Sequence, residues 1–252
     1  MVDVRKRRGE LCVRLSKLSN LLSSTIDNCS FFNQPCLLCG SHAADAGLCT
    51  PCRADIVRLP DNTCRHCALP ISSGDCCGRC LRRPPAFDAL HVPYEFCYPM
   101  KALIHAFKYG KRLEIAGVLG QLLTETACEI PATIDIVIAV PLSKERLAER
   151  GFNQSVELAQ ALTAIMPERF QPDLCWRKSN TTPQAGLGVR QRRRNVKNAF
   201  CVETRLDGLS VAIVDDVVTS CSTLESVAVM LKKQGVKRVE AWALARTLPL
   251  NT

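Results

Sequence analysis

Two stretches of this chain carry the same pattern of four cysteines. Residues 36–52 read CLLCGSHAADAGLCTPC and residues 64–80 read CRHCALPISSGDCCGRC, so that both follow Cys-x2-Cys-x9-Cys-x2-Cys with a shift of 28 residues. Each Cys-x2-Cys turn presents two thiolates to one ion, and two turns complete a tetrahedral zinc site. With four protein ligands the expected sites are structural. The predicted ligands are Cys36, Cys39, Cys49 and Cys52 in the first repeat and Cys64, Cys67, Cys77 and Cys80 in the second.

The sequence leaves some points about these cysteines open. Zinc can be held within each repeat or by pairs exchanged between repeats, and Cys76 competes with Cys77 as a ligand, although only Cys77 keeps the repeat register. Two disulfides per repeat are the alternative to metal. They are disfavoured because Arg14 and Lys17 interrupt any signal-peptide core, which favours a cytoplasmic protein. No apolar run approaches the length of a membrane span.

Beyond Pro84-Pro85, strand-like and helical patterns alternate. Apolar runs at 90–96, 135–142, 211–218 and 236–245 alternate with helical patterns at 99–109, 113–127, 153–165 and 222–234. This alternation predicts an α/β domain, a Rossmann-like parallel sheet with helices on both faces. The predicted domains are a basic N-terminal extension with an amphipathic helix (1–30), a double zinc ribbon (31–84) and the α/β domain (85–252).

Ligands bind beyond the carboxyl ends of the strands in such sheets, which directs attention to VAIVDDVVTSCST at 211–223. Asp215 and Asp216 end the strand, and a hydroxyl-rich loop then leads into a helix. Amide groups at a helix N-terminus bind phosphate, and carboxylates accept hydrogen bonds from sugar hydroxyls, so the stretch suits a phosphorylated sugar. The alternatives are a plain capped helix, a receiver aspartate, or a Walker B strand, for which the chain lacks the Gly-Lys-Ser/Thr loop.

Basic residues surround this predicted site, in a chain of formal net charge +9. Lys144, Arg146 and Arg150 follow the apolar run 135–142 and suit a diphosphate, although a solvated basic face is the alternative. Residues 178–198 form a long basic connection of the kind that often closes over a site. A nucleic-acid patch is the alternative there, but Phe200 is the one aromatic residue available for base stacking.

The stretch VDDVVTSCST resembles the phosphoribosyl pyrophosphate (PRPP) signature of type I phosphoribosyltransferases, in which two acids precede a Thr/Ser-Gly-x-Thr phosphate loop. The whole chain resembles the ComF/GntX family, in which a double zinc ribbon precedes such a domain. The cysteine repeat carries this resemblance together with FKYGKR (107–112), VPLSKERLAERGFNQS (140–155) and NTTPQAGLGVRQRRRNVKNAF (180–200). It covers roughly residues 36–247.

The resemblance implies a site for PRPP and Mg²⁺. It places Asp215 and Asp216 as catalytic acids on the ribose hydroxyls, and Lys144, Arg146 and Arg150 on pyrophosphate. The implied PRPP-binding residues are Asp215, Asp216, Val217, Val218, Thr219, Ser220, Cys221, Ser222 and Thr223. The implied flexible loop contains Thr182, Gln184, Arg190, Arg194 and Asn195. The chain is also a candidate homodimer.

Cys221 departs from the family pattern, because it stands where the family has glycine. It strains the loop if φ is positive and is harmless if φ is negative. The sequence therefore leaves three alternative functions. The first is a phosphoribosyltransferase with an unknown acceptor, linked to competence, to DNA uptake or use, and to nucleotide metabolism. The second is a non-catalytic PRPP-binding module, and the third is an accessory whose ribbons contact single-stranded DNA or a DNA-uptake ATPase.

Overall fold

The computed structural model describes residues 35–42, 44–45, 47–110, 112, 114–129, 133–178 and 199–249. The helix predicted within residues 11–26 lies outside these ranges. So do the five flexible-loop residues, Thr182, Gln184, Arg190, Arg194 and Asn195. Among the described residues, no helix combines the length and the hydropathy that crossing a bilayer requires.

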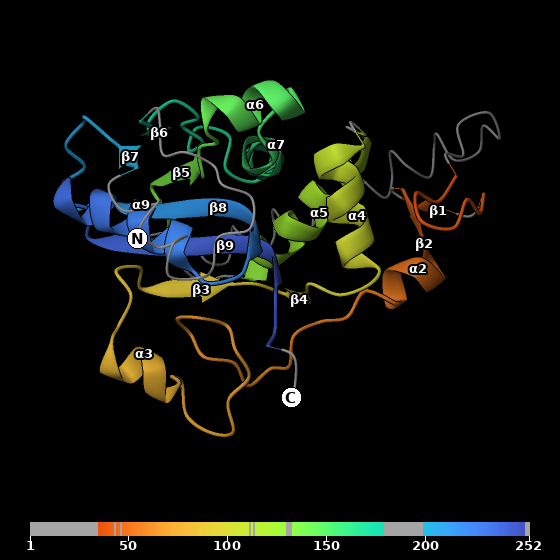
Figure 1. Cartoon of the computed structure of the whole chain (residues 1–252), viewed down its shortest axis with the longest axis horizontal. Coiled ribbons are helices and arrows are strands. Elements are labelled where there is room, and N and C mark those ends of the chain that lie inside the picture. Colours follow the sequence, from red (N-terminus) through yellow and green to blue (C-terminus); the bar gives the residue numbers. More distant parts are fainter. Residues whose placement is uncertain are drawn as a thin grey trace, which may run out of the picture.

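A five-stranded parallel sheet forms the centre of the structure (Figure 1). Its order is β3-β9-β8-β5, and β4 pairs with β9 beyond β3. The strands are β3 (Ala89–His91), β4 (Tyr94–Glu95), β5 (Ile136–Ala139), β8 (Ser210–Val218) and β9 (Arg238–Arg246). The predicted parallel sheet is confirmed. The first predicted strand is divided in two at Val92 and Pro93, since proline has no N–H to donate to the sheet.

Helices cover both faces of this sheet, as the alternating pattern predicted. On one face, α4 (Met100–Tyr109), α5 (Glu114–Glu129) and α7 (Gln154–Ala161) pack against Ala212 and Val214 of β8. On the other face, α9 (Ser222–Lys233) packs against Val211 and Ile213. Successive side chains of a strand point to opposite faces, so the continuous apolar run of β8 supplies both halves of the core.

Several short elements were not expected from the sequence. Helix α6 (Lys144–Arg150) follows β5, and the 3₁₀ helix η1 (Leu162–Ala164) extends α7 within the predicted range 153–165. Strands β6 (Trp176–Arg177) and β7 (Phe200–Cys201) pair antiparallel. They lie immediately before and after the long basic connection, and their pairing brings its two ends together.

The two cysteine repeats dock at different places on the α/β domain (Figure 1). The first contains β1 (Ala44–Asp45), β2 (Leu48–Cys49) and α2 (Thr50–Ala54), and Arg53 of α2 forms an ion pair of 2.6 Å with Glu125 of α5. The second contains α3 (Gly78–Arg82) and lies against the core on the α9 face of the sheet, where Ala68 packs with residues of α9. Each repeat is therefore supported by a different part of the domain.

Candidate functional site

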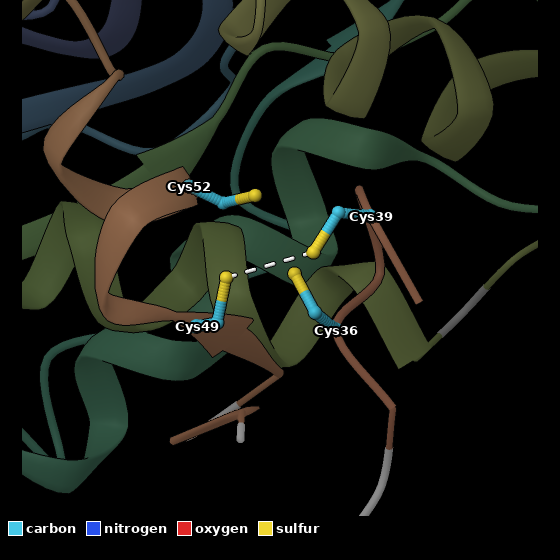
Figure 2. Close-up of side chains that lie close together, drawn as sticks. All are labelled: Cys36, Cys39, Cys49 and Cys52. Atoms are coloured by element: carbon cyan, nitrogen blue, oxygen red, sulfur yellow. Dashed lines mark hydrogen bonds between the residues drawn. The ribbon is translucent and has the colours of Figure 1, made fainter. Parts of the chain in front are cut away.

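The eight predicted ligand cysteines form two clusters. Within each cluster the four sulfur atoms all lie within 4.8 Å of one another, and Figure 2 shows those of the first facing a common space. Zinc bound to four sulfurs at about 2.3 Å separates them by about 3.8 Å. The Cys39–Cys49 and Cys67–Cys77 sulfur distances are 3.6 and 3.7 Å. The geometry therefore fits one structural zinc ion in each cluster.

The clusters resolve the points that the sequence left open. Each set comes from a single repeat, so each zinc ion is held within one repeat and not by cysteine pairs from two different repeats. Cys77 belongs to the second set, whereas Cys76 lies outside it, with its sulfur 3.9 Å from that of Cys64. All eight ligand cysteines are free of disulfides, contrary to the alternative of two disulfides per repeat.

Asp215 and Asp216 lie together at the carboxyl end of β8, each with different partners. Asp215 Oδ1 accepts hydrogen bonds from Ser155 Oγ (3.1 Å) and from the Asp216 amide (2.9 Å). Asp216 Oδ2 lies 2.6 Å from Lys108 Nζ. Burial, and next the neighbouring Asp216 carboxylate, raise the pKa of Asp215 to about 7, while Lys108 and Ser155 oppose the rise. Asp215 is therefore poised to change charge near neutral pH.

Lys108 is a residue of this site that the sequence analysis did not assign. It belongs to the block FKYGKR, which carried the resemblance without receiving a role. The available signal was its place near the end of a predicted helix of the domain. Its contact with Asp216 spans 108 residues of sequence and was not accessible to pattern reasoning.

The segment GFNQS (151–155) brings the region after β5 to the end of β8. Gly151 ends α6 with φ of 82°, a left-handed conformation that glycine adopts readily. Asn153 caps α7: its Oδ1 accepts from the Ser155 amide, while its Nδ2 donates to the Val140 carbonyl, both at 3.0 Å. These bonds fix the first turn of α7, and with it the Ser155 hydroxyl that donates to Asp215.

The predicted pyrophosphate residues all lie in α6 but differ in their surroundings. Lys144 and Arg146 are exposed in its first turn. Arg150 turns inward instead, donating to Gln154 Oε1 at 2.8 Å and lying 5.3 Å from the centre of the Tyr109 ring. Burial and then the charge of Arg146 lower the pKa of Arg177 in β6, so a further cation lies near Arg146.

The hydroxyl-rich loop enters the N-terminus of α9 through Cys221. Cys221 has φ of 61° and ψ of 3°, so the alternative of a harmless negative φ is wrong. The backbone keeps the conformation that glycine favours. The Cys221 side chain packs against the second cysteine cluster, and the hydroxyls of Ser220 and Ser222 are 2.8 Å apart. The loop and the second ribbon are therefore in direct contact.

These features define a class of protein: a double zinc ribbon joined to a parallel α/β domain, with an acid pair near the end of one strand and a hydroxyl-rich loop after it. Residues 30–81 match the double zinc ribbon domain family. Over 211 residues the chain is 37% identical to the DNA utilization protein YhgH of Escherichia coli O6:H1, covering 80% of this chain and 91% of the relative. It is 32% identical to Competence protein F of Haemophilus influenzae, covering 86% and 99%.

The chain therefore belongs to the ComF/GntX family, whose members join a double zinc ribbon to a type I phosphoribosyltransferase domain. This confirms the resemblance read from the sequence. Among solved structures, an allosteric regulatory enzyme of purine biosynthesis aligns with 55% of this chain and 29% of its own, at 17% identity and a TM-score of 0.39. That likeness is too low to support a conclusion about function.

Proposed function

We propose that this protein binds PRPP and displaces its pyrophosphate with an acceptor of unknown identity. The observation that carries the proposal is the continuity of the stretch 211–223, in which the acid pair lies near the carboxyl end of β8 and the hydroxyl-rich loop leads from β8 into α9. One short segment thus offers carboxylates to a ribose and helix N-terminal amides to its 5′-phosphate. The names of the relatives support a connection with competence or DNA use.

In this proposal each group has a separate role. Asp215 and Asp216 accept hydrogen bonds from the ribose hydroxyls, and the loop from Thr219 to Thr223, which follows β8, holds the 5′-phosphate. Lys144 and Arg146 attract the pyrophosphate. Arg150, at the other end of α6, contacts Tyr109 and Gln154 and so holds the C-terminal end of this helix in place. Catalysis would then come from orientation and from cations placed near the departing charge.

Mg²⁺ fits this set of donors as an ion brought by PRPP. Carboxylate, hydroxyl and phosphate oxygens are its preferred ligands, and it would neutralise charge on the leaving pyrophosphate. Because Asp216 is already paired with Lys108, the acid pair is better suited to the ribose than to enclosing a free cation. The residues of this chain therefore supply the ribose and phosphate contacts.

Binding and turnover are tested separately. Calorimetry with PRPP and Mg²⁺ is expected to show binding that is lost in Asp216→Asn. Pyrophosphate release is then measured across a panel of nucleobases and amines, with Asp216→Asn as the inactive control. Absence of PRPP binding by the wild-type protein would contradict the proposal.

A second candidate is a non-catalytic PRPP-binding or DNA-uptake accessory protein. It is favoured by Cys221, which occupies the glycine position of the phosphate loop with φ of 61°. PRPP binding without pyrophosphate release would support it. Binding of single-stranded DNA, or of a DNA-uptake ATPase, through the zinc ribbons would add the accessory role. Cytoplasmic location and homodimerisation remain predictions from the sequence.

A further inference from the structure

Arg246, the last residue of β9, joins the second zinc ribbon to the loop after β8. The residue is buried, with 2% of its surface exposed. Its Nε donates to the backbone carbonyl of the zinc ligand Cys67 at 2.7 Å. Its Nη1 donates to the carbonyls of Val218 (3.0 Å), Thr219 (2.5 Å) and Thr247 (2.8 Å). One guanidinium group therefore links a zinc-binding turn to the start of the proposed phosphate loop.

Cys221 makes a second contact between this ribbon and the loop. Its side chain packs against the cluster of Cys64, Cys67 and Cys80. Residues other than glycine hold a left-handed backbone conformation only where their surroundings impose it. The second ribbon supplies these surroundings on one side of Cys221, so the shape of the loop depends on how that ribbon is folded.

The first ribbon is docked on another part of the domain. Its buried residues, such as Leu48 and Ile56, pack in the core cluster of α4 and α5. Arg53 fixes it to Glu125 of α5 through an ion pair of 2.6 Å. The two zinc sites are alike in ligands and spacing, yet it is a carbonyl of the second ribbon that accepts from Arg246, which also donates to Val218 and Thr219.

The position of Arg246 also depends on the fold around Cys67. A buried guanidinium is stable only when hydrogen bonds and opposite charge compensate it. Carbonyl oxygens supply the hydrogen bonds, and zinc held by four thiolates leaves the adjacent site with net negative charge. Metal binding organises such cysteine turns, because the ligands are not held in place without it. Zinc at the second site thus fixes the carbonyl on which Arg246 is anchored.

We propose that Arg246 is a positioning residue for the phosphate loop, and that zinc at the second site, not the first, sets the affinity of this loop for a phosphate ester. The inference rests on the proposed function, since it takes residues 219–223 as the loop that binds the 5′-phosphate. Coupling between two binding sites is reciprocal. A phosphate ester bound at the loop must therefore tighten zinc at the second site by the same factor.

The first test uses the full zinc-loaded chain without substitutions. Zinc is competed away with a chelator at equilibrium, with and without saturating ribose 5-phosphate, and alkylation mapped by mass spectrometry identifies which cysteines have lost their metal. Ribose 5-phosphate is expected to raise the zinc affinity of the second site by about tenfold and to leave the first site unchanged. Equal effects on both sites, or no effect on either, would overturn the inference.

The second test compares Arg246→Lys with Arg53→Lys, a matched control in the first ribbon. Lysine keeps the charge of Arg246 but cannot reach the Cys67 and Val218 carbonyls together. Arg246→Lys is expected to keep two zinc ions per chain while binding ribose 5-phosphate about tenfold more weakly, and to lose the tightening of the second zinc. Arg53→Lys is expected to match the wild-type protein in all three measurements.

The outcomes separate this inference from the proposed function. Arg246→Lys with wild-type affinity for ribose 5-phosphate overturns the role of Arg246 while PRPP binding stands. A wild-type protein that binds neither ribose 5-phosphate nor PRPP with Mg²⁺ overturns the proposed function, and the inference with it. If Arg246→Lys does not fold, the zinc competition on the unaltered chain still decides, because it involves no substitution.

Discussion

Lys108 Nζ lies 2.6 Å from Asp216 Oδ2, so a cation from α4 reaches the acid pair at the end of β8. The pair is sheltered, with 19% of the lysine side chain and 10% of the aspartate side chain exposed. Solvent screens such a pair less than one on the surface. Lys108 also opposes the rise in the pKa of Asp215, so one lysine affects both carboxylates.

Replacing Lys108 by methionine is expected to weaken PRPP binding at pH 7 by about tenfold, since removing a nearby cation raises the pKa of Asp215 further and leaves more of it protonated. Calorimetry over a pH series measures the change, and affinity is expected to recover at higher pH. Lys101→Met, in an exposed position of the same helix, is the control. Equal affinities of Lys108→Met and Lys101→Met at pH 7 would contradict the prediction.

Asp215 is expected to make stability depend on pH in an unusual direction. Its pKa in the folded protein, about 7, lies above the ordinary value of 3.8, so the folded state holds the proton more tightly than the unfolded state. Its contribution to the unfolding free energy is therefore favourable at low pH and is lost as pH rises from about 4 to about 7. The charged form, which accepts from ribose hydroxyls, predominates only above that window.

Asp215→Asn isolates this effect, because asparagine can still accept the bonds from Ser155 and the Asp216 amide. The variant is expected to melt above the wild-type protein at pH 8 by at least about 2–4 °C, the shift that about 1 kcal/mol produces in a chain of this size, with the gap closing near pH 4. Thermal unfolding across this range measures it, and Asp173→Asn, at an exposed position, controls for loss of charge alone. A constant gap at all pH values would rule out the buried titration.

Cys76→Ser and Cys77→Ser form a matched pair of adjacent substitutions. Cys77 belongs to the second four-sulfur set and Cys76 does not. Metal analysis is expected to give two zinc ions per chain for the wild-type protein and for Cys76→Ser, and one for Cys77→Ser, since serine replaces a ligand only in the last case. If Cys76→Ser lost one zinc ion and Cys77→Ser kept two, Cys76 and not Cys77 would be the zinc ligand, and the prediction would be wrong.

The parallel sheet was predictable from the alternation of apolar runs and helical patterns along the domain, whereas the predicted groups of site residues each lie within a short segment. The four cysteines of a repeat span 17 residues, and the acid pair and the hydroxyl-rich loop lie within the 13 residues of 211–223. Lys108 and Arg246 were missed because their partners, Asp216 and Cys67, lie 108 and 179 residues away. Helix α6 was missed for another reason: at seven residues it is too short for helical periodicity to stand out.

Cys221→Gly and Cys221→Ala separate backbone strain from packing. Both remove the contact with the second cysteine cluster, but only glycine relieves the cost of φ of 61°. The unfolding free energy of Cys221→Gly is therefore expected to exceed that of Cys221→Ala by about 1 kcal/mol. Denaturant unfolding of the zinc-loaded proteins measures the difference. Equal stabilities would mean that the loop does not hold this backbone conformation in solution.

Lys144 and Arg146 are expected to act on the pyrophosphate and not on the ribose phosphate. Both lie exposed in the first turn of α6, after β5, whereas the phosphate loop follows β8. A double variant, Lys144→Gln with Arg146→Gln, is expected to bind PRPP with Mg²⁺ about tenfold more weakly and to bind ribose 5-phosphate unchanged, since only PRPP carries the diphosphate that these cations attract.

The control for this variant is Lys233→Gln, at the exposed end of α9 farthest from the phosphate loop. It removes a cation from the chain without altering α6, so it measures the effect of net charge alone. Calorimetry with the two ligands at a single ionic strength gives the comparison. Equal weakening of PRPP and ribose 5-phosphate in the α6 variant would assign these residues to general attraction of anions. Weakening confined to PRPP would place the diphosphate beside α6, with the acid pair of β8 left for the sugar.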